Sequence, residues 1–544
     1  MNPDIDIYRN GRIWTEYGQD FVESVAVAHG KLLAVGTDEE MLQSFPHCRD
    51  VFDLGGRFVI PGLADAHTHV ARHALEVRMI ECRDFVDPKV DSIAEVLKRF
   101  RLSAEGARPD EWILGLGAMR QQARFAERRW PTRDELDAAV PNNPCYIVFG
   151  SHVTVANSVA LSAVGYDEGT PDPHGGKIGR DPATGRLNGL LLEHAGKALH
   201  RDLTEIYGFD DLVDSLERSL YSCAERGVTC IHDILDDINY VRAYQRLYEE
   251  DRLPIRVQLL LRVMNAEFDL DSIRSLGLRQ GFGDDWLWLG GGKVSIDGGF
   301  TGRSAAFKST IDGKPLCEPI IRIEQDELNR TIKAANDIGF RMCIHAIGDL
   351  AVDQAIAAFE GASSGKANLR NRIEHFGNWL CTPERLSKCK ELGITPMPNP
   401  AFLYYLGSDA WDLLGGERHY ALSAFPFRTL LRSGFNYSTG SDGPGYYPID
   451  GLRDLSSLVL RSSFDGQEFD ASEGLTLDEA LRLQTANAAW LAYKEDSLGK
   501  LAPGMCADFV VLDIDDLRSC AASEIAKLPV RCTIVGGNMI HGGL

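Results

Sequence analysis

The stretch 60–70, "IPGLADAHTHV", closes an apolar run with two histidines, His67 and His69. Residues i and i+2 of a β-strand point to the same face, so the two imidazoles would project together from the end of a strand. Two neutral imidazoles on one face suit a divalent transition metal. A pair of hydrogen-bonded histidines beside a loop fits these residues equally well, so the rest of the chain has to decide.

The composition narrows the class of protein. The chain has 544 residues, is 44% hydrophobic and carries a formal net charge of −22, which argues against nucleic acids and anionic membranes as partners. No apolar stretch approaches the roughly 20 residues of a membrane helix. Twelve cysteines without a C-x-x-C pair indicate reduced thiols and a cytoplasmic protein. The composition does not decide between a monomer and a homo-oligomer.

A pattern of helix, glycine and strand recurs along the chain. Apolar segments follow Gly227, Gly339, Gly393 and Gly434, which fit the left-handed residue that ends a helix. Short strands that alternate with helices indicate parallel β/α units. Eight such strands can be counted, ending with "FNYSTGSDG" at 435–443, which is the number of a closed (β/α)₈ barrel of the TIM type.

Ionisable residues gather at the strand ends of this predicted barrel. Active sites of such barrels lie at the C-terminal ends of the strands. The residues concerned are His67 and His69 on strand one, Lys293 on strand four, His345 on strand five, His375 on strand six and Asp442 on strand eight. Their convergence favours a metal site. The alternatives are an ordinary strand-capping lysine, core histidines and a turn aspartate.

Two regions fall outside the barrel, which we place at residues 61–494. Residues 1–60 and 495–544 are strand-like and punctuated by glycine, and they suit a small β-sandwich built from both chain ends. Residues 75–215 are too long for a plain β/α loop, so we expect an insertion after the first barrel strand that covers the mouth. Within it, Thr132–Glu135 ("TRDE") forms a capping box that starts a helix.

An ordered series of motifs makes the chain resemble a known family. The motifs include "PGLADAHTH", "GSHVTVANSVAL", "GVTCIHD", "GGKVSIDGG", "IHAIGDLAVDQAI", "RIEHFG", "GSDGP" and "LAPGMCADFVVLD". They resemble the amidohydrolase superfamily, and within it amidohydrolase family 3, the group of YtcJ-like proteins and N-substituted formamide deformylases. The resemblance covers nearly the whole chain and is much less specific for substrate than for family.

The resemblance implies roles for individual residues. His67 and His69 match the ligands of a first metal, His345 and His375 those of a second, and Lys293 the lysine that CO₂ carboxylates to bridge them. Asp442 matches an aspartate that is both ligand and proton shuttle, while His152 and Asn157 match a motif that we expect to face substrate. The ligand set suits one or two divalent ions, with Zn²⁺ favoured over Mn²⁺ or Fe²⁺.

Three stretches depart from the family pattern near the expected substrate face. "GLGAMRQQ" replaces a Gly-Trp-Asp stretch, Gly299 and Phe300 replace Ser-Leu, and "PMPNP" replaces a Gln-Pro pair. They leave the metal ligands untouched. His232 and Asp233 also end a strand, and we expect them to support the site rather than bind metal.

These observations predict a metal-dependent hydrolase that cleaves a non-peptide amide or cyclic amide bond of a small molecule through a metal-activated hydroxide. Asp442 would act as general base and then general acid. An esterase or lactonase on the same metal site and a non-catalytic metal-binding homologue remain alternatives. Aromatic residues after the barrel strands predict a largely apolar substrate. Trp379 would contact it, and Arg303 and Arg418 would hold its carbonyl or carboxylate.

Overall fold

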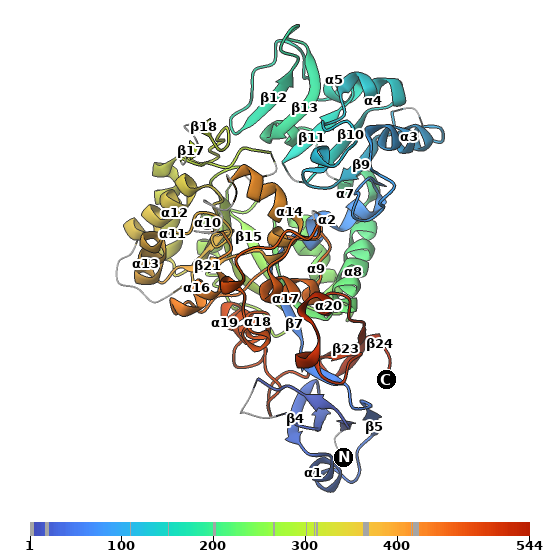
Figure 1. The fold of residues 1–544 in the computed structure, drawn as a ribbon, viewed down its shortest axis with the longest axis vertical. Coiled ribbons are helices and arrows are strands. Elements are labelled where there is room, and N and C mark those ends of the chain that lie inside the picture. The colour runs from blue at the N-terminus through green and yellow to red at the C-terminus, as the bar shows by residue number, and fades with distance from the viewer. Residues whose placement is uncertain are drawn as a thin grey trace.

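The computed structural model places a parallel sheet between two further groups of strands (Figure 1). In Figure 1 the strands that lie between residues 80 and 193 are at one end of the molecule, and the two termini are at the opposite end. The structure describes residues 5–16, 21–108, 110–150, 152–199, 203–264, 267–300, 302–308, 310–311, 314–362, 369–414, 416, 424–445 and 447–544.

The central sheet is parallel throughout and runs in the order β21-β20-β19-β16-β15-β14-β7. Its strands are β7 (Leu63–Thr68), β14 (Val228–Leu235), β15 (Arg256–Arg262), β16 (Leu287–Ser295), β19 (Met342–His345), β20 (Arg372–Glu374) and β21 (Thr395–Met397). Neighbours in the sheet are also neighbours in the barrel order, as parallel β/α units require. The predicted α/β fold of the TIM type is confirmed at this level.

The eighth predicted strand, at residues 435–442, is extended chain rather than a regular strand. It still runs beside β7, because the amide of Asp442 donates to the carbonyl of His67 at 2.9 Å. The amide of Ser441 donates instead to the side chain of Asp65 at 3.0 Å, which interrupts the ladder of backbone hydrogen bonds. The prediction of eight regular strands was therefore wrong here, although this segment takes the expected place beside the first strand.

Helices connect the strands and surround the sheet (Figure 1). They are α2 (Val70–His73), α8 (Phe209–Glu225), α9 (Ile238–Glu249), α10 (Leu270–Ser275), α11 (Gln325–Asp337), α12 (Asp349–Ala362), α13 (Pro383–Leu392), α14 (Pro400–Leu413), α16 (Phe427–Arg432), α17 (Gly451–Leu460), α18 (Leu477–Leu483) and α19 (Ala486–Leu491). Two short strands, β17 (Thr310–Ile311) and β18 (Lys314–Pro315), form a separate pair between β16 and α11.

Four glycines end helices as predicted. Gly227, Gly339, Gly393 and Gly434 follow α8, α11, α13 and α16, with φ of +78°, +68°, +66° and +76°. A residue with a Cβ is strained in this left-handed conformation, whereas glycine adopts it freely. The glycines therefore turn the chain from each helix toward the next part of the sheet.

The segment between β7 and β14 forms a sheet of its own in the order β12-β13-β11-β10-β9-β8. Its elements are β8 (Ile80–Glu81), α3 (Ile93–Ala104), β9 (Ile113–Gly117), α4 (Arg133–Ala139), β10 (Cys145–Phe149), β11 (Val153–Ala156), α5 (Ser158–Ala163), β12 (Gly176–Arg180), β13 (Leu187–Glu193), α6 (His194–Lys197) and α7 (Leu203–Tyr207). The predicted capping box is confirmed, because Thr132 and Glu135 each bind the other's backbone amide at the start of α4.

The two ends of the chain form two further sheets, of which the first contains N-terminal strands alone and the second contains strands from both ends. One has the order β4-β3-β1-β5 and the other the order β2-β6-β22-β23-β24, and residues of both share one buried apolar cluster. The elements are β1 (Asp6–Arg9), β2 (Arg12–Ile13), β3 (Ser24–Ala28), β4 (Lys31–Gly36), α1 (Asp38–Ser44), β5 (Asp50–Asp53), β6 (Phe58–Pro61), β22 (Phe509–Leu512), α20 (Ala522–Ile525), β23 (Val530–Val535) and β24 (Asn538–Gly542). The domain boundaries given above stay predictions.

Two general expectations can be compared with the structure. All twelve cysteines are free thiols, and all but Cys48 and Cys520 are buried. A cytoplasmic location stays a prediction. None of the helices in the described parts of the chain combines the length and apolar character that a membrane crossing needs.

Candidate metal centre

Four histidine rings meet at the C-terminal ends of the central strands. The ring centroid of His67 lies 5.6 Å from that of His69 and 4.9 Å from that of His375. The ring of His345 lies 4.6 Å from that of His375. All four side chains are buried. The structure therefore brings together the four histidines that the sequence singles out on different strands.

Asp442 completes a cluster with the first two histidines. Its Oδ1 atom lies 3.2 Å from Nε2 of His67 and 3.2 Å from Nε2 of His69. One ligand atom from each of the three residues lies within 4.8 Å of the others. The buried Nε2 of His67 makes no well-aligned hydrogen bond with the described residues. A buried nitrogen left in this state beside a carboxylate fits a divalent metal such as zinc.

The other ring nitrogen of His67 is held by a buried carboxylate. Its Nδ1 contacts Oε2 of Glu374, and Arg372 donates to both oxygens of Glu374 at 2.6 and 2.9 Å. Burial alone would raise the pKa of Glu374, but Arg372 and His67 outweigh it and hold that pKa well below its usual range. A carboxylate on Nδ1 fixes the tautomer that leaves Nε2 free for a metal.

Polar partners also orient the second pair of histidines. Nδ1 of His375 lies 2.8 Å from Oδ1 of Asn399, whose amide nitrogen donates to the carbonyl of Gly440. Nε2 of His345 lies 3.4 Å from Oδ1 of Asp297. Asn399 belongs to the stretch "PMPNP", so a departure from the family pattern positions one of the candidate ligands.

Burial favours the neutral form of His69, His345 and His375, which is the form that binds metal. Burial lowers the pKa of His69 to about 3, although Asp442 acts in the opposite direction. Burial likewise lowers the pKa of His375 to about 3 and that of His345 well below its usual value. For Asp442, burial would raise the pKa, but the contacts with His67 and His69 outweigh it and keep the carboxyl ionised.

Lys293 lies on β16 and is 1% exposed, yet it makes no hydrogen bond or ion pair with the described residues. Its side chain lines the same small cavity as His345, His375 and Asp442. Burial lowers the pKa of Lys293 to about 8, so the neutral amine is more populated than in an exposed lysine. The lysine is thus placed where the sequence predicts it, beside the ligand candidates.

Two of the candidate ligands have left-handed backbones. His375 has φ of +69° and Asp442 has φ of +64°. This region is uncommon for residues other than glycine, and such strain concentrates at functional sites because the surrounding structure must hold it.

The cavity next to the histidines has a volume of about 70 Å³, and every residue that lines it is polar or charged. On its far side, the insertion contributes His152, whose Nδ1 lies 3.0 Å from Oε2 of Glu193. The structure thus places His152 in the same cavity as His69, His345, His375 and Asp442. Three further lining residues come from the insertion, namely Glu193, His194 and Lys197.

Glu193, which is not among the site residues predicted from the sequence, organises this part of the cavity. Its carboxylate accepts from Ser304 and Arg322 besides contacting His152. Burial would raise the pKa of Glu193, but His152 and Arg322 outweigh it and the pKa is lowered. The sequence does contain a sign of this role. In "LNGLLLE" every second residue is buried, and the final glutamate falls on one of these positions.

Several predicted substrate contacts lie elsewhere. Asn157 is fully buried inside the insertion, where its side chain caps α5 and binds Cys145, Val140 and Asn143. Trp379 is 2% exposed and stacks on Phe300 at 4.6 Å within the apolar core. Arg303 is exposed and lines a different cavity of about 660 Å³. Arg418 lies outside the described residues. The structure does not place Asn157, Trp379 or Arg303 at the histidines.

The aromatic residues expected to wall the site mostly pack on one another. Phe402 stacks on His375 at 5.7 Å, and Tyr405 stacks on Tyr447 at 4.1 Å. Phe85 from the insertion adds to the second stack. These rings pack between the insertion and the barrel, and their apolar faces contact one another. None of them lines the polar cavity.

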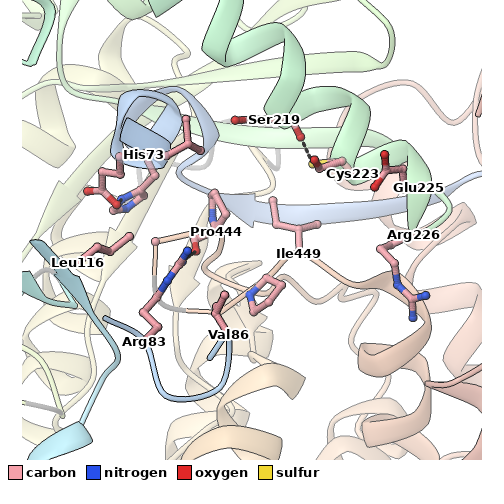
Figure 2. A pocket seen from close by; sticks show the side chains of 15 residues that line it. His73, Arg83, Val86, Leu116, Ser219, Cys223, Glu225, Arg226, Pro444 and Ile449 are labelled. Atoms are coloured by element: carbon pink, nitrogen blue, oxygen red, sulfur yellow. Dashed lines mark hydrogen bonds and ion pairs between the residues drawn. The ribbon is translucent and has the colours of Figure 1, made fainter. Parts of the chain in front are cut away.

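A further cavity of about 320 Å³ lies next to α2 (Figure 2). Figure 2 shows His73, Arg83 and Pro444 on one side and Ser219 and Cys223 of α8 on the other. None of the metal-ligand candidates lines it. The chemistry of the four histidines therefore belongs to the smaller polar cavity.

The strand-two residues support the site as expected. Asp233 accepts from the hydroxyl of Thr68 at 2.8 Å, from the amides of Val70 and Ala71, and from the hydroxyl of Tyr244. These bonds hold the chain on both sides of His69. The side chain thus positions a ligand candidate.

Comparisons with known proteins identify the family of the chain. The family model of the amidohydrolase family matches residues 50–541. The chain is 28% identical to the N-substituted formamide deformylase of Arthrobacter pascens, covering 95% of this chain and 94% of that protein. It is 28% identical to YtcJ of Bacillus subtilis, covering 98% and 99%.

Solved structures give the same result. A crystal structure of an uncharacterized metal-dependent hydrolase from Pyrococcus furiosus superposes with a TM-score of 0.71 and 26% identity, covering 94% of this chain and 99% of that one. The family match extends over nearly the whole chain, from the sheet of the chain ends through every candidate ligand. The chain therefore belongs to the amidohydrolase family, and it is a hydrolase that acts on carbon–nitrogen bonds.

Proposed function

We propose that the protein is a metal-dependent hydrolase that cleaves a non-peptide amide or cyclic amide bond of a small molecule. The cluster of His67, His69 and Asp442 carries this proposal, because its ligand atoms lie within 4.8 Å of one another at the strand ends. The neutral state of His69 and His375 and the ionised state of Asp442 support it.

One or two divalent ions, with zinc favoured, would be held by His67, His69 and Asp442 and by His345 and His375. Bound there, such an ion supplies Lewis acidity, which lowers the pKa of water and polarises a carbonyl group. Glu374 and Asn399 keep two of the imidazoles in the required orientation through their Nδ1 atoms.

Lys293 would carry a carbamate between the two halves of the site. Its neutral amine attacks the carbon of CO₂, a nitrogen–carbon bond forms, and one proton is released to solvent, which leaves an anionic oxygen ligand. The buried and unpaired amine beside His345 and His375 supports this assignment. Without such a modification, a charged ammonium in the same place would repel a metal ion.

Asp442 would hold and move the proton during hydrolysis. Its carboxylate takes a proton from the attacking water and returns it to the departing amine, so it acts first as general base and then as general acid. The low pKa keeps it ionised and ready to accept the proton.

The test combines metal content with activity. Purified protein should contain one to two divalent ions per chain, chelation should abolish hydrolysis of an amide panel, and Zn²⁺ or Mn²⁺ should restore it. Lys293→Ala should lose metal and activity together, and short carboxylic acids should partly restore both. His47→Asn, at an exposed site away from the cluster, is the control and should retain both. Full amide hydrolysis by metal-free protein would overturn the proposal, and an ester panel run alongside would show whether esters are preferred.

A further inference from the structure

One wall of the polar cavity carries three cationic side chains. Arg72 comes from α2, Lys197 from α6 and Arg262 from β15, and all three line the cavity together with Asp236. Within this group of four described lining residues, the single carboxylate of Asp236 stands against three cations. The chain as a whole carries a net charge of −22, so a local excess of positive charge is not a by-product of composition.

The contacts inside this group leave one cation without a partner. Asp236 accepts from Nη1 of Arg72 at 3.2 Å and lies 4.0 Å from Nε of Arg262. Arg262 also donates to the hydroxyl of Ser295 at 2.8 Å. Lys197 makes no hydrogen bond or ion pair with the described residues. Its ammonium is therefore available to a ligand in the cavity.

Most of the charges around the ammonium of Lys197 are positive. Burial lowers the pKa of Lys197 to about 8, and Arg262, Arg322 and Arg72 lower it further, against a weaker effect of Asp236. At neutral pH the group is still mostly protonated. An anion bound beside it would relieve this repulsion.

Other charges in the cavity are paired. Arg322 is paired with Glu193, which also binds His152. Lys197 is thus the cation of this group of three that has no partner among the described residues.

The cationic wall adjoins the candidate metal ligands. Arg262 and Lys293 are register partners on neighbouring strands β15 and β16, which places their backbones roughly 4.8 Å apart. Ser295, which accepts from Arg262, follows Lys293 by two residues and lines the same cavity. A small molecule whose carbonyl group lies at the histidines can therefore reach the cations with another part of itself.

We propose that Arg72, Lys197 and Arg262 form a subsite for a carboxylate on the substrate, so that the enzyme acts on amides that carry a carboxylate near the scissile bond, such as N-acyl amino acids. The inference rests on the proposed hydrolase function and replaces the expected apolar substrate. Guanidinium groups and an ammonium are the side chains that bind carboxylates by charge-assisted hydrogen bonds. The small polar cavity offers no apolar wall for a large aromatic group.

The test compares matched substrates in the metal-loaded enzyme. N-formyl and N-acetyl amino acids are assayed beside the same molecules with the carboxylate converted to a carboxamide. The wild-type enzyme should show kcat/KM at least tenfold higher for the acids. Lys197→Met keeps the length of the side chain and should lower kcat/KM for the acids by roughly 10- to 100-fold, mainly through KM, because a charge-assisted hydrogen bond is lost. It should leave the carboxamides unchanged.

Lys98→Met, at an exposed site of α3, is the matched control and should behave as wild type. Calorimetric titration with the free N-acyl amino acid at 4 °C, in the slow Asp442→Asn background, gives a second readout that needs no turnover. Binding that weakens at least tenfold on adding Lys197→Met supports the subsite.

The outcomes separate the two proposals. Equal kcat/KM for acids and carboxamides, or equal acid binding with and without Lys197→Met, overturns the subsite while the hydrolase function stands. Hydrolysis by chelated, metal-free protein overturns the metal-dependent function, whereas the binding titration still decides whether the cationic wall takes a carboxylate.

Discussion

The Oδ1 atom of Asp442 lies 3.2 Å from the Nε2 atom of His67, and this contact joins β7, the last strand of the central sheet, to the segment that runs beside it. His67 belongs to β7, and Asp442 ends the extended segment beside that strand. The amide of Asp442 also donates to the carbonyl of His67 at 2.9 Å. This main-chain hydrogen bond sets the distance between the two backbones from which the side chains extend. The relative position of the two candidate ligands is therefore set by the fold.

Asp442→Asn should reduce kcat by roughly 10²- to 10⁴-fold, because a positioned general base is lost while the shape of the side chain is kept. The histidines should still hold at least one metal ion, which elemental analysis would show. The measurement is steady-state kcat on the best amide substrate, with Asp513→Asn in the sheet of the chain ends as control. A variant with near-normal kcat would remove Asp442 from proton transfer.

Glu374→Gln should weaken metal binding by roughly 10- to 100-fold, because the carboxylate that orients His67 is replaced by a neutral amide. It should also destabilise the fold by about 3–5 kcal/mol, since Arg372 is left as an unpaired buried charge. Competitive metal titration and urea denaturation measure the two effects. Glu391→Gln, on the exposed side of α13, should change neither, and a stable Glu374→Gln with normal affinity would contradict the assignment.

Gly299→Ala should disturb the insertion side of the cavity. A Cβ at Gly299 would lie 2.3 Å from Nε2 of His152, so the ring must move away from its place beside Glu193. We expect a KM increase of tenfold or more with unchanged metal content. Gly106→Ala adds a methyl group in open space and serves as control. Unchanged kinetics of Gly299→Ala would show that His152 does not contact substrate.

The metal-free protein should lose stability as the pH falls. Burial lowers the pKa of His69 and of His375 to about 3 in the folded state, whereas unfolded histidine titrates near about 6.5. Between these values the unfolded chain binds more protons, so the free energy of unfolding falls as pH is lowered, by up to about 1.4 kcal/mol per pH unit for each group.

Urea denaturation of the metal-free protein between pH 7.5 and 5.5 measures this slope. His375→Gln should reduce the slope relative to His47→Gln, because His375 is buried and His47 is exposed. Equal slopes in the two variants would contradict the assignment of a neutral buried His375.

The convergence of the candidate ligands could be expected from the sequence because most of them lie at or near the end of a segment with a recognisable strand pattern. His67, His345 and Lys293 follow short apolar runs, and parallel strands carry such positions to one edge of the sheet. The eighth strand was predicted less well, because the side chain of Asp65 takes the amide of Ser441 that a regular ladder would use. Such a competition between side chain and backbone has no periodic signature.

The substrate side was predicted less well for a different reason. Asn157 and Trp379 lie in family-like or aromatic stretches, yet both are buried by neighbours that no local pattern reveals. The cationic wall joins Arg72, Lys197 and Arg262 from elements far apart in the chain. Single charged residues on helices and strand ends are common in any sequence, so only the packed structure shows that these three face one cavity.

The pairing of β6 with β22 has a consequence for the order in which the site is made. β6 leads through Gly62 directly into β7, and it pairs with β22 near the end of the chain, where the amide of Gly62 donates to the carbonyl of Asp508 at 3.0 Å. A ribosome releases β22 after every candidate ligand has been synthesised. The strand that carries His67 is therefore anchored at its base only when translation is nearly finished.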